Sequence, residues 1–125
     1  MDQSFKKEER LRSKKIIDLL FEKGSSFSLG PIRTIQLGVE LIAGNPVQVL
    51  IAVPKKNIPQ AVNRNKLKRR MREAYRKNKN ILIDQLRESD KGMAIALVYT
   101  EREVISYSDI EDKIILSLQR LARRE

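Results

Sequence analysis

The chain contains no cysteine, no histidine and no tryptophan among its 125 residues. Without cysteine it has no disulfides, no thiolate nucleophile and no cysteine-ligated zinc. Without histidine it lacks the commonest general base and the commonest metal ligand. Only a carboxylate pair, a lysine or a tyrosine is left as a candidate for catalysis. The sequence therefore argues against an enzyme that works with its own side chains.

Long apolar runs and glycine motifs are also missing. No stretch approaches the ~20 apolar residues of a membrane span, and the first 12 residues, which are mostly charged and polar, do not resemble a secretory signal. The five glycines are scattered, so no phosphate-binding loop or dinucleotide-binding pattern occurs. We expect a cytoplasmic protein that contacts no membrane, with a single domain over residues 1–125 whose first seven residues form a flexible arm.

The acidic residues offer little for metal binding. Asp84 and Glu88 are four apart on a predicted helix, and Glu101 and Glu103 lie near the end of a predicted strand. Isolated acids at such spacings usually face solvent. We therefore predict no catalytic residue and no metal ligand in the protein itself.

The net charge of +10 is concentrated in one segment of the chain. The 25 residues from Lys55 to Lys79 contain eleven lysines and arginines against a single acid, Glu73, whereas the other 100 residues hold fifteen bases and fifteen acids. Charge that serves solubility alone is usually dispersed over a surface. A focused cationic element instead raises the local concentration of a polyanion and speeds its capture.

The periodicity of apolar residues predicts an α+β domain. The expected elements are a helix at 13–23, strands at 25–29, 34–41 and 47–53, a helix at 61–79, a shorter helical piece at 81–88, a strand at 93–99 and a last helix from 108. We expect Gly24 to end the first helix in the left-handed conformation, strands 34–41 and 47–53 to pair antiparallel, and Ser108 to open a capping box. This order predicts a two-layer α/β sandwich, whose strand–helix–strand step would by default be right-handed.

The basic segment divides into two sides when it is placed on a helix. One side, which can pack on the sheet, carries Leu67, Met71, Ala74 and Tyr75. The opposite side carries Asn65, Arg69, Arg72 and Arg76, and is bordered by Lys68 and Lys79. Like charges four residues apart repel by a few tenths of a kcal/mol per pair. A helix selected for stability alone would interleave acids with these bases, so a densely charged anionic partner is the economical explanation.

Other partners are less consistent with this helix. A solvated basic face would need no partner, and an anionic membrane surface would need large apolar residues beside the cationic row. Charge alone does not separate DNA from RNA. No helix-turn-helix, zinc finger or heptad zipper is present to place the helix in a DNA groove, so we expect no DNA partner.

The helix also carries a spaced pattern, Arg64-Asn65-x-x-Lys68-Arg69-x-x-Arg72-Glu73, preceded by a strand and a loop rich in proline and lysine. Further along the chain stand Leu11-Arg12, Phe21-x-x-Gly24 and Val53-Pro54-Lys55-Lys56. Together these residues resemble the bacterial ribonuclease P protein component, which usually has serine where this chain has Pro54. Roughly residues 5 to 122 follow the family pattern in the same order.

The resemblance implies a fold of helix, three strands, helix, strand, helix, similar to the second domain of ribosomal protein S5, with a left-handed β-α-β crossover instead of the default. It implies that the chain is the protein subunit of ribonuclease P, a ribonucleoprotein endonuclease in which RNA is the catalyst and holds most of the Mg²⁺. The subunit would bind the catalytic RNA and the 5′ leader of precursor tRNA, and so promote 5′ maturation of tRNA.

Carried onto this chain, the resemblance assigns catalytic-RNA contacts to Arg64, Asn65, Lys68, Arg69 and Arg72, extended by Lys55 and Lys56. Lys66 and Arg76 complete the predicted RNA-binding set. The leader groove would lie between the first helix and the sheet, at Ile17, Phe21, Arg33 and Ile35. Only Phe21 keeps the aromatic character of that groove, and Arg33 could stack on a base or bind phosphate instead. Ile17 and Phe21 equally suit a hydrophobic core. The alternative function is a non-catalytic RNA-binding protein of the ribosome or its assembly, which needs no groove.

Overall fold

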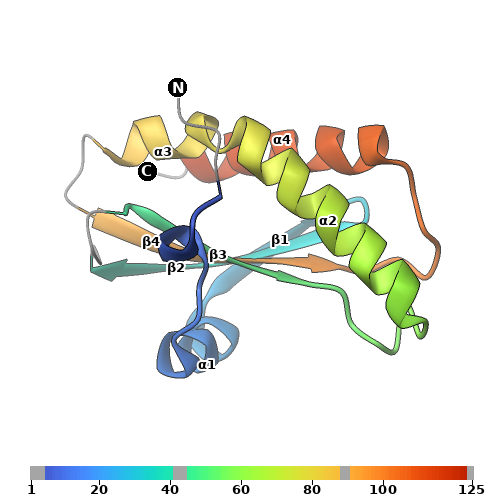
Figure 1. The fold of residues 1–125 in the computed structure, drawn as a ribbon. Coiled ribbons are helices and arrows are strands. Elements are labelled where there is room, and N and C mark those ends of the chain that lie inside the picture. Colours follow the sequence, from blue (N-terminus) through green and yellow to red (C-terminus); the bar gives the residue numbers. More distant parts are fainter. Residues whose placement is uncertain (1–4, 41–44, 88–90, 124–125) are drawn as a thin grey trace.

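The computed structural model describes residues 5–40, 45–87 and 91–123, which form an α+β domain around one four-stranded sheet (Figure 1). Its elements are η1 (Lys7–Glu9), α1 (Lys14–Lys23), β1 (Ser25–Leu29), β2 (Ile32–Glu40), β3 (Val47–Ala52), α2 (Ala61–Asn78), α3 (Asn80–Leu86), β4 (Lys91–Tyr99) and α4 (Tyr107–Arg123). The helix that the sequence predicts after the basic segment is a separate element, α3, which begins directly after Lys79.

Strand β4 lies inside the sheet, whose strand order is β1-β2-β4-β3. It pairs antiparallel with β2 and parallel with β3. The expected antiparallel pairing of the strands at 34–41 and 47–53 is therefore wrong, because β4 lies between them. The physical reason is the apolar run from Met93 to Tyr99: such a strand gains most where both of its faces are covered, and residues 92–97 are all buried.

Helices cover both faces of the sheet (Figure 1). Helices α2, α3 and α4 lie on one face and enclose the larger core, which includes Leu67, Ile95 and Leu118. Helix α1 lies on the other face, where Leu20 and Ile35 belong to a second, smaller core. The predicted two-layer sandwich is thus incomplete, because the wide apolar face of α1 needs sheet surface of its own. None of the helices in the described ranges combines the length and apolarity needed to cross a membrane.

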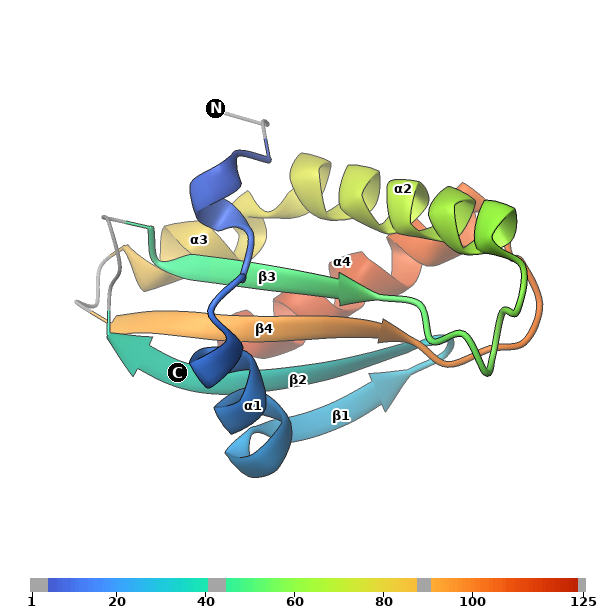
Figure 2. The same ribbon diagram turned by 60° about the horizontal axis from the view of Figure 1, so that its bottom comes forward.

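The connection from β3 through α2 and α3 to β4 is left-handed. In Figure 2 both strands run to the right with β3 above β4. The helices that stand above the sheet in Figure 1 are turned to its far side in this view. The chain therefore leaves β3, passes behind the sheet and returns in the strand below, which is the opposite of the right-handed default.

Two helix ends differ from the expectations. Gly24 follows α1 with φ −68° and ψ 154°, which is extended and not left-handed. Glycine is needed there for space, because an added Cβ would lie 2.4 Å from the carbonyl oxygen of Leu20. Helix α4 begins at Tyr107, and its cap is Ser106 instead of Ser108, since the Ser106 Oγ accepts a hydrogen bond from the backbone N–H of Asp109 at 3.2 Å.

The segment before α1 runs along the free edge of β3. The backbone N–H of Leu11 donates to the Val49 carbonyl at 2.9 Å, and Arg10 forms a parallel bridge with Val49. Phe5 packs edge-on against Tyr75 of α2, with the ring centroids 5.5 Å apart. Residues 1–4 of the expected flexible arm lie outside the described residues, whereas Phe5 packs against the domain and Lys7 begins η1. This segment covers an edge strand that would otherwise expose unpaired backbone groups.

Candidate nucleic-acid interface

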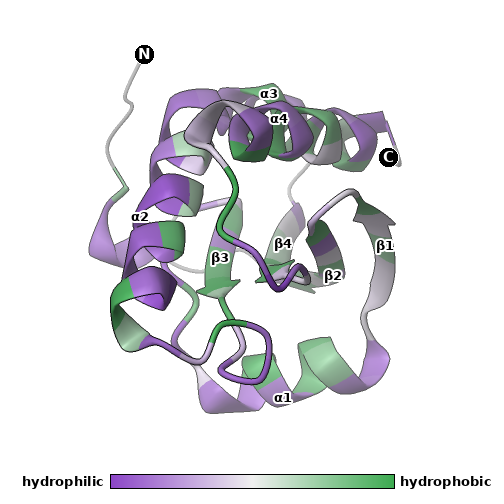
Figure 3. Cartoon of the chain, turned by 90° about the vertical axis from the view of Figure 1, so that its right-hand side faces the viewer, coloured by the Kyte–Doolittle hydropathy of each residue, from purple (hydrophilic) through white to green (hydrophobic). Residues whose placement is uncertain are grey.

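Helix α2 turns its apolar side toward the sheet. Leu67, Met71, Ala74 and Tyr75 are fully buried, as their helical spacing predicts. Burial also raises the pKa of the Tyr75 hydroxyl above its usual value. These four contacts fix the rotation of α2 about its own axis, so the opposite side of the helix faces solvent. Figure 3 shows α2 as a mainly hydrophilic ribbon along the outside of the fold.

The outward side of α2 presents Asn65, Arg69 and Arg72, all of them exposed. Within the described ranges, neither Arg69 nor Arg72 forms a hydrogen bond or an ion pair with another residue. Lys66 and Lys68 of the same helix are half-buried. A guanidinium can bind a phosphate through two parallel N–H groups, and Arg69 and Arg72 retain all of theirs for a ligand. We call Asn65, Lys68, Arg69 and Arg72 the outward row.

Two other arginines of α2 bind the fold itself. Nη1 of Arg64 donates to the carbonyl oxygens of Ile58 at 3.0 Å and Pro59 at 2.6 Å, which ties the first turn of α2 to the preceding loop. Nη1 of Arg70 donates to the carbonyl oxygen of Ile105 at 2.5 Å, in the segment before α4. The loop that Arg64 holds also carries the exposed Lys55 and Lys56.

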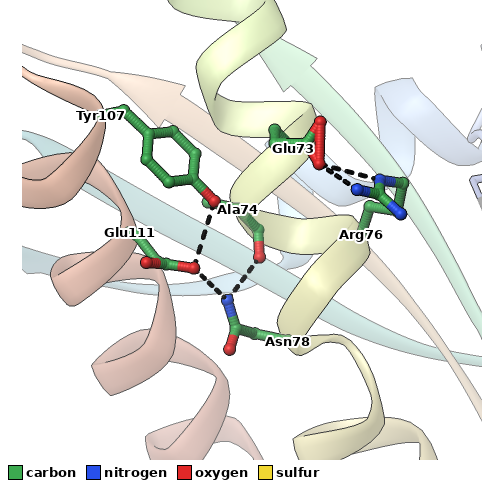
Figure 4. Close-up of polar contacts among 6 residues, drawn as sticks. All are labelled: Glu73, Ala74, Arg76, Asn78, Tyr107 and Glu111. Atoms are coloured by element: carbon green, nitrogen blue, oxygen red, sulfur yellow. Dashed lines mark hydrogen bonds and ion pairs between the residues drawn. The ribbon is translucent and has the colours of Figure 1, made fainter. Parts of the chain in front are cut away.

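Polar contacts fix the C-terminal end of α2 against α4 (Figure 4). The Asn78 amide donates to the carbonyl oxygen of Ala74 at 2.8 Å and to the Glu111 carboxylate at 3.1 Å. The Tyr107 hydroxyl donates to the same carboxylate oxygen, also at 3.1 Å. Burial, together with this hydrogen bond to Glu111, raises the pKa of Tyr107 to about 12.

Two predicted members of the basic face have acidic partners. Arg76 is half-buried and its Nε lies 3.0 Å from the carboxylate of Glu73, to which the guanidinium is ion-paired (Figure 4). Lys79 was expected to border the outward row, and this is wrong. Its ammonium lies 2.5 Å from the Glu9 carboxylate, and both side chains are less than a tenth exposed. The reason is a distant partner: Glu9 of η1, seventy residues away in the sequence, pairs with Lys79 directly after the end of α2.

Two arginines that the sequence interpretation left out of the RNA-binding set lie beside the outward row. Arg10 and Arg12, in the segment before α1, are both exposed. Arg10 lines one hollow with Arg69 and Arg72, and it lines an adjoining hollow with Arg12 and Arg72. No local pattern predicts this meeting of distant segments. The only signal was the place of Leu11-Arg12 in the family pattern.

The four predicted groove residues have different surroundings. Ile35 is only 3% exposed and belongs to the small core, against which Ile17 is half-buried. Phe21 is 51% exposed, so the alternative that it is a core residue is wrong. Arg33 is exposed on β2, and its guanidinium lies 3.4 Å from the hydroxyl of Ser26. The contact between α1 and the sheet therefore includes Ile17 and Ile35 and leaves Phe21 and Arg33 open to solvent.

The outward row and the groove residues provide groups for binding. In the part of the chain that the structure describes, no group of three acidic side chains is placed to hold a metal ion. Guanidinium and ammonium groups can neutralise phosphates, and an exposed aromatic ring can stack on an unpaired base.

Comparisons with known proteins assign the family. The family model of Ribonuclease P matches residues 5–122. A ribonuclease P protein component from Porphyromonas gingivalis is 37% identical over 117 residues, covering 93% of this chain and 85% of that protein. Another, from Chlorobium phaeobacteroides, is 41% identical over 107 residues, covering 77% of this chain and 71% of the relative.

Solved structures agree with this assignment. The RNase P protein from Thermotoga maritima is similar with a TM-score of 0.71 at 26% identity, covering 90% of this chain and 96% of that one. The RNase P protein from Staphylococcus aureus has a TM-score of 0.69 at 18% identity, covering 90% and 96%, and this likeness shows the fold alone. The chain therefore belongs to the family of ribonuclease P protein components, whose role is that of the protein subunit in the 5′ processing of tRNA.

Proposed function

We propose that the chain binds the catalytic RNA of ribonuclease P through the outward row of α2. The observation that carries this proposal is the pair Arg69 and Arg72: both are exposed on a helix whose opposite side is fully buried. An anchored helix holds its guanidiniums in fixed directions, so less conformational entropy is lost when phosphates bind. Asn65 and Lys68 lie in the same row, where an amide can reach a base edge or a 2′-hydroxyl.

The other residues predicted to contact the RNA differ in whether their side chains already have partners in the fold. Lys55 and Lys56 extend the surface from the exposed loop before α2, and Lys66 adds a cation on the helix. Arg64 positions that loop through one nitrogen, which leaves its other N–H groups for RNA. Arg76 contributes less than Arg69, because Glu73 already neutralises its charge.

The 5′ leader of precursor tRNA would bind on the face of the sheet that carries α1. Phe21 supplies an exposed ring for a base, and Arg33 supplies a guanidinium for a phosphate or for stacking. Ile17 and Ile35 would support this surface from beneath instead of touching RNA, because both pack in the small core. The groove would thus rely on one aromatic ring and one cation.

The chemistry of phosphodiester hydrolysis would belong to the RNA, with Mg²⁺ held mainly by that RNA. The protein would contribute positive charge, which lowers the repulsion between RNA segments and metal-binding phosphates. Such a particle would work in the cytoplasm. A likeness to the second domain of ribosomal protein S5 remains a prediction, which the left-handed crossover supports.

Reconstitution tests the proposed function. The chain is combined with a bacterial catalytic RNA at low Mg²⁺, and cleavage of precursor tRNA is measured with and without protein. We expect stimulation by the wild type and its loss in Arg69→Ala/Arg72→Ala. Arg87→Ala/Arg123→Ala is the matched control, because both arginines are exposed, one directly after α3 and the other at the end of α4. Absence of stimulation by the wild-type chain would refute the function.

A second measurement separates the subunit from a ribosomal or assembly protein. The reconstituted complex is titrated with precursor tRNA and with mature tRNA. A leader surface at Phe21 and Arg33 predicts tighter binding of the precursor, and Phe21→Ala should reduce that preference. Equal affinities for the two RNAs would contradict the leader surface and favour the non-catalytic alternative.

A further inference from the structure

The outer edge of β3, along which the segment before α1 runs, is flanked by basic residues from two parts of the chain. The segment before α1 contributes Arg10 and Arg12, and α2 contributes Arg72. These residues surround two adjoining hollows of about 180 and 280 Å³ that share Phe5, Arg10 and Arg72. In the first hollow, half-buried Ile51 of β3 supplies an apolar lining on the face of the sheet that α2 covers, whereas its neighbour Leu50 packs toward the opposite face. We call Arg10, Arg12, Ile51 and Arg72 the edge site.

The edge site is held in shape by contacts of the N-terminal segment. Phe5 packs edge-on against the buried Tyr75, and the guanidinium of Arg10 lies 5.2 Å from the centre of the Phe5 ring. The buried ion pair between Glu9 and Lys79 ties the same segment to the end of α2. Arg10 is therefore fixed beside α2 and does not extend freely into solvent.

The chemistry of the edge site suits a polyanion that also carries flat apolar groups. Its guanidiniums can bind phosphates, and the hydrocarbon lining can accept one face of a base. Of the acids beside it, Glu73 in the second hollow is already paired with Arg76, and Glu8 lines a neighbouring hollow with Arg10 and Arg12. A duplex keeps its bases stacked and paired inside, so only a single strand can offer both groups at once.

We propose that the edge site binds single-stranded RNA, with phosphates on Arg10, Arg12 and Arg72 and a base on Ile51. The N-terminal segment passes from the helical layer, across the edge of β3, to α1 on the opposite face (Figures 1 and 2). The edge site therefore joins the outward row on one face with the α1 surface on the other. This inference rests on the proposed function and adds a third RNA-binding surface to it.

The test compares two double variants of equal charge. Arg10→Gln/Arg12→Gln removes two cations of the edge site, and Arg87→Gln/Arg123→Gln removes two exposed cations outside it. Affinity for a short single-stranded RNA is measured against salt concentration. Each lost phosphate contact should flatten the log–log slope by about 0.7, so the first variant should lose about 1.4 and the control should keep the wild-type slope. Equal slopes in the two variants would overturn the edge site.

Three further measurements separate lost RNA binding from lost charge, lost fold and a general affinity for RNA. Arg10→Lys/Arg12→Lys keeps the charge and should keep the slope, and thermal melting of each variant separates lost binding from lost fold. A duplex of the same sequence should show less slope difference between wild type and the glutamine variant; an equal difference would overturn the preference for single strands.

Reconstitution with the catalytic RNA separates the edge site from the proposed function. If Arg69→Ala/Arg72→Ala loses that RNA while Arg10→Gln/Arg12→Gln matches the control in both assays, only the edge site fails. If the wild-type chain does not stimulate cleavage, the proposed function fails, and the oligonucleotide slopes still decide the edge site.

Discussion

The arginines of α2 fall into two groups that the sequence alone makes look alike. Arg69 and Arg72 face solvent without a partner in the described part of the chain, whereas Arg64 and Arg70 donate to backbone carbonyls. Arg76 stands between the groups, exposed in part and ion-paired with Glu73. A run of positive charge is therefore not one functional unit: some cations hold the helix in place so that others can point outward.

Removal of the buried cation should have the largest effect on stability. Lys79→Ala leaves the Glu9 carboxylate buried without its partner, which should cost about 3–5 kcal/mol of unfolding free energy. Urea denaturation measures the loss. The double variant Glu9→Leu/Lys79→Met, which removes both charges, should recover most of it. A Lys79→Ala protein as stable as wild type would show that this cation does not stabilise the fold.

The buried side of α2 is tested by Leu67→Ala. Loss of a fully buried leucine should cost about 2–5 kcal/mol and lower the melting temperature. Val62→Ala on the same helix is the control, because Val62 is 75% exposed and should change stability by less than about 0.5 kcal/mol. Similar melting temperatures for the two variants would mean that α2 is rotated differently about its axis.

The adjacent residues Arg69 and Arg70 belong to different groups, so their alanine variants compare the two groups directly. Arg70→Ala removes a charged donor from the Ile105 carbonyl and should cost about 1–2 kcal/mol of stability. Arg69→Ala should leave stability within about 0.5 kcal/mol and weaken catalytic-RNA binding. Melting curves and RNA titrations of both variants measure this. Equal losses of stability in Arg69→Ala and Arg70→Ala would contradict the division of the arginines into two groups.

The contacts at the end of α2 should give the smallest effect, visible at alkaline pH. The pKa of Tyr107 is raised from about 10 in the unfolded chain to about 12 in the fold. The unfolded chain then releases the proton first, so this contribution to stability is full below about pH 10 and is lost as pH rises toward 12. Tyr107→Phe should cost about 1 kcal/mol at neutral pH and reduce the alkaline decline.

Urea denaturation across that pH range checks the Tyr107 prediction, and absorbance of the tyrosinate follows the titration directly. Burial also raises the pKa of Tyr75 and of Tyr99, so part of the alkaline decline should remain in Tyr107→Phe. The hydrogen bond to Glu111 would be contradicted if the wild type showed a tyrosine titration at the usual pKa and Tyr107→Phe lacked that titration.

Local spacing was enough to predict the parts of the fold that depend on one element. Leu67 and Tyr75 are buried as their positions on the helix require, and β4 contains the strand that the apolar run at 93–99 predicts. The four residues Ile110, Ile114, Leu118 and Leu121 of α4 are buried for the same reason. Periodicity records which side of an element is apolar, so these results follow from residues close together in the chain.

Features that depend on distant segments could not be predicted in this way. The burial of Lys79 depends on Glu9, seventy residues away, and on the helix ending one residue earlier than expected. The meeting of Arg10 with Arg72 depends on the N-terminal segment following β3, and strand pairing depends on which strand best fills the centre of the sheet. The family pattern named the arginines of α2 but not which of them the fold itself binds.

The salt dependence of catalytic-RNA binding shows whether Arg69 and Arg72 bind phosphates while Arg64 and Arg70 hold the fold. Wild type, Arg69→Ala/Arg72→Ala and Arg64→Ala/Arg70→Ala are titrated with the RNA over a range of salt concentrations, and their melting temperatures are recorded. We expect the first variant to flatten the slope by about two units with an unchanged melting temperature, and the second to melt lower with less change in slope. A wild-type slope in Arg69→Ala/Arg72→Ala would contradict it.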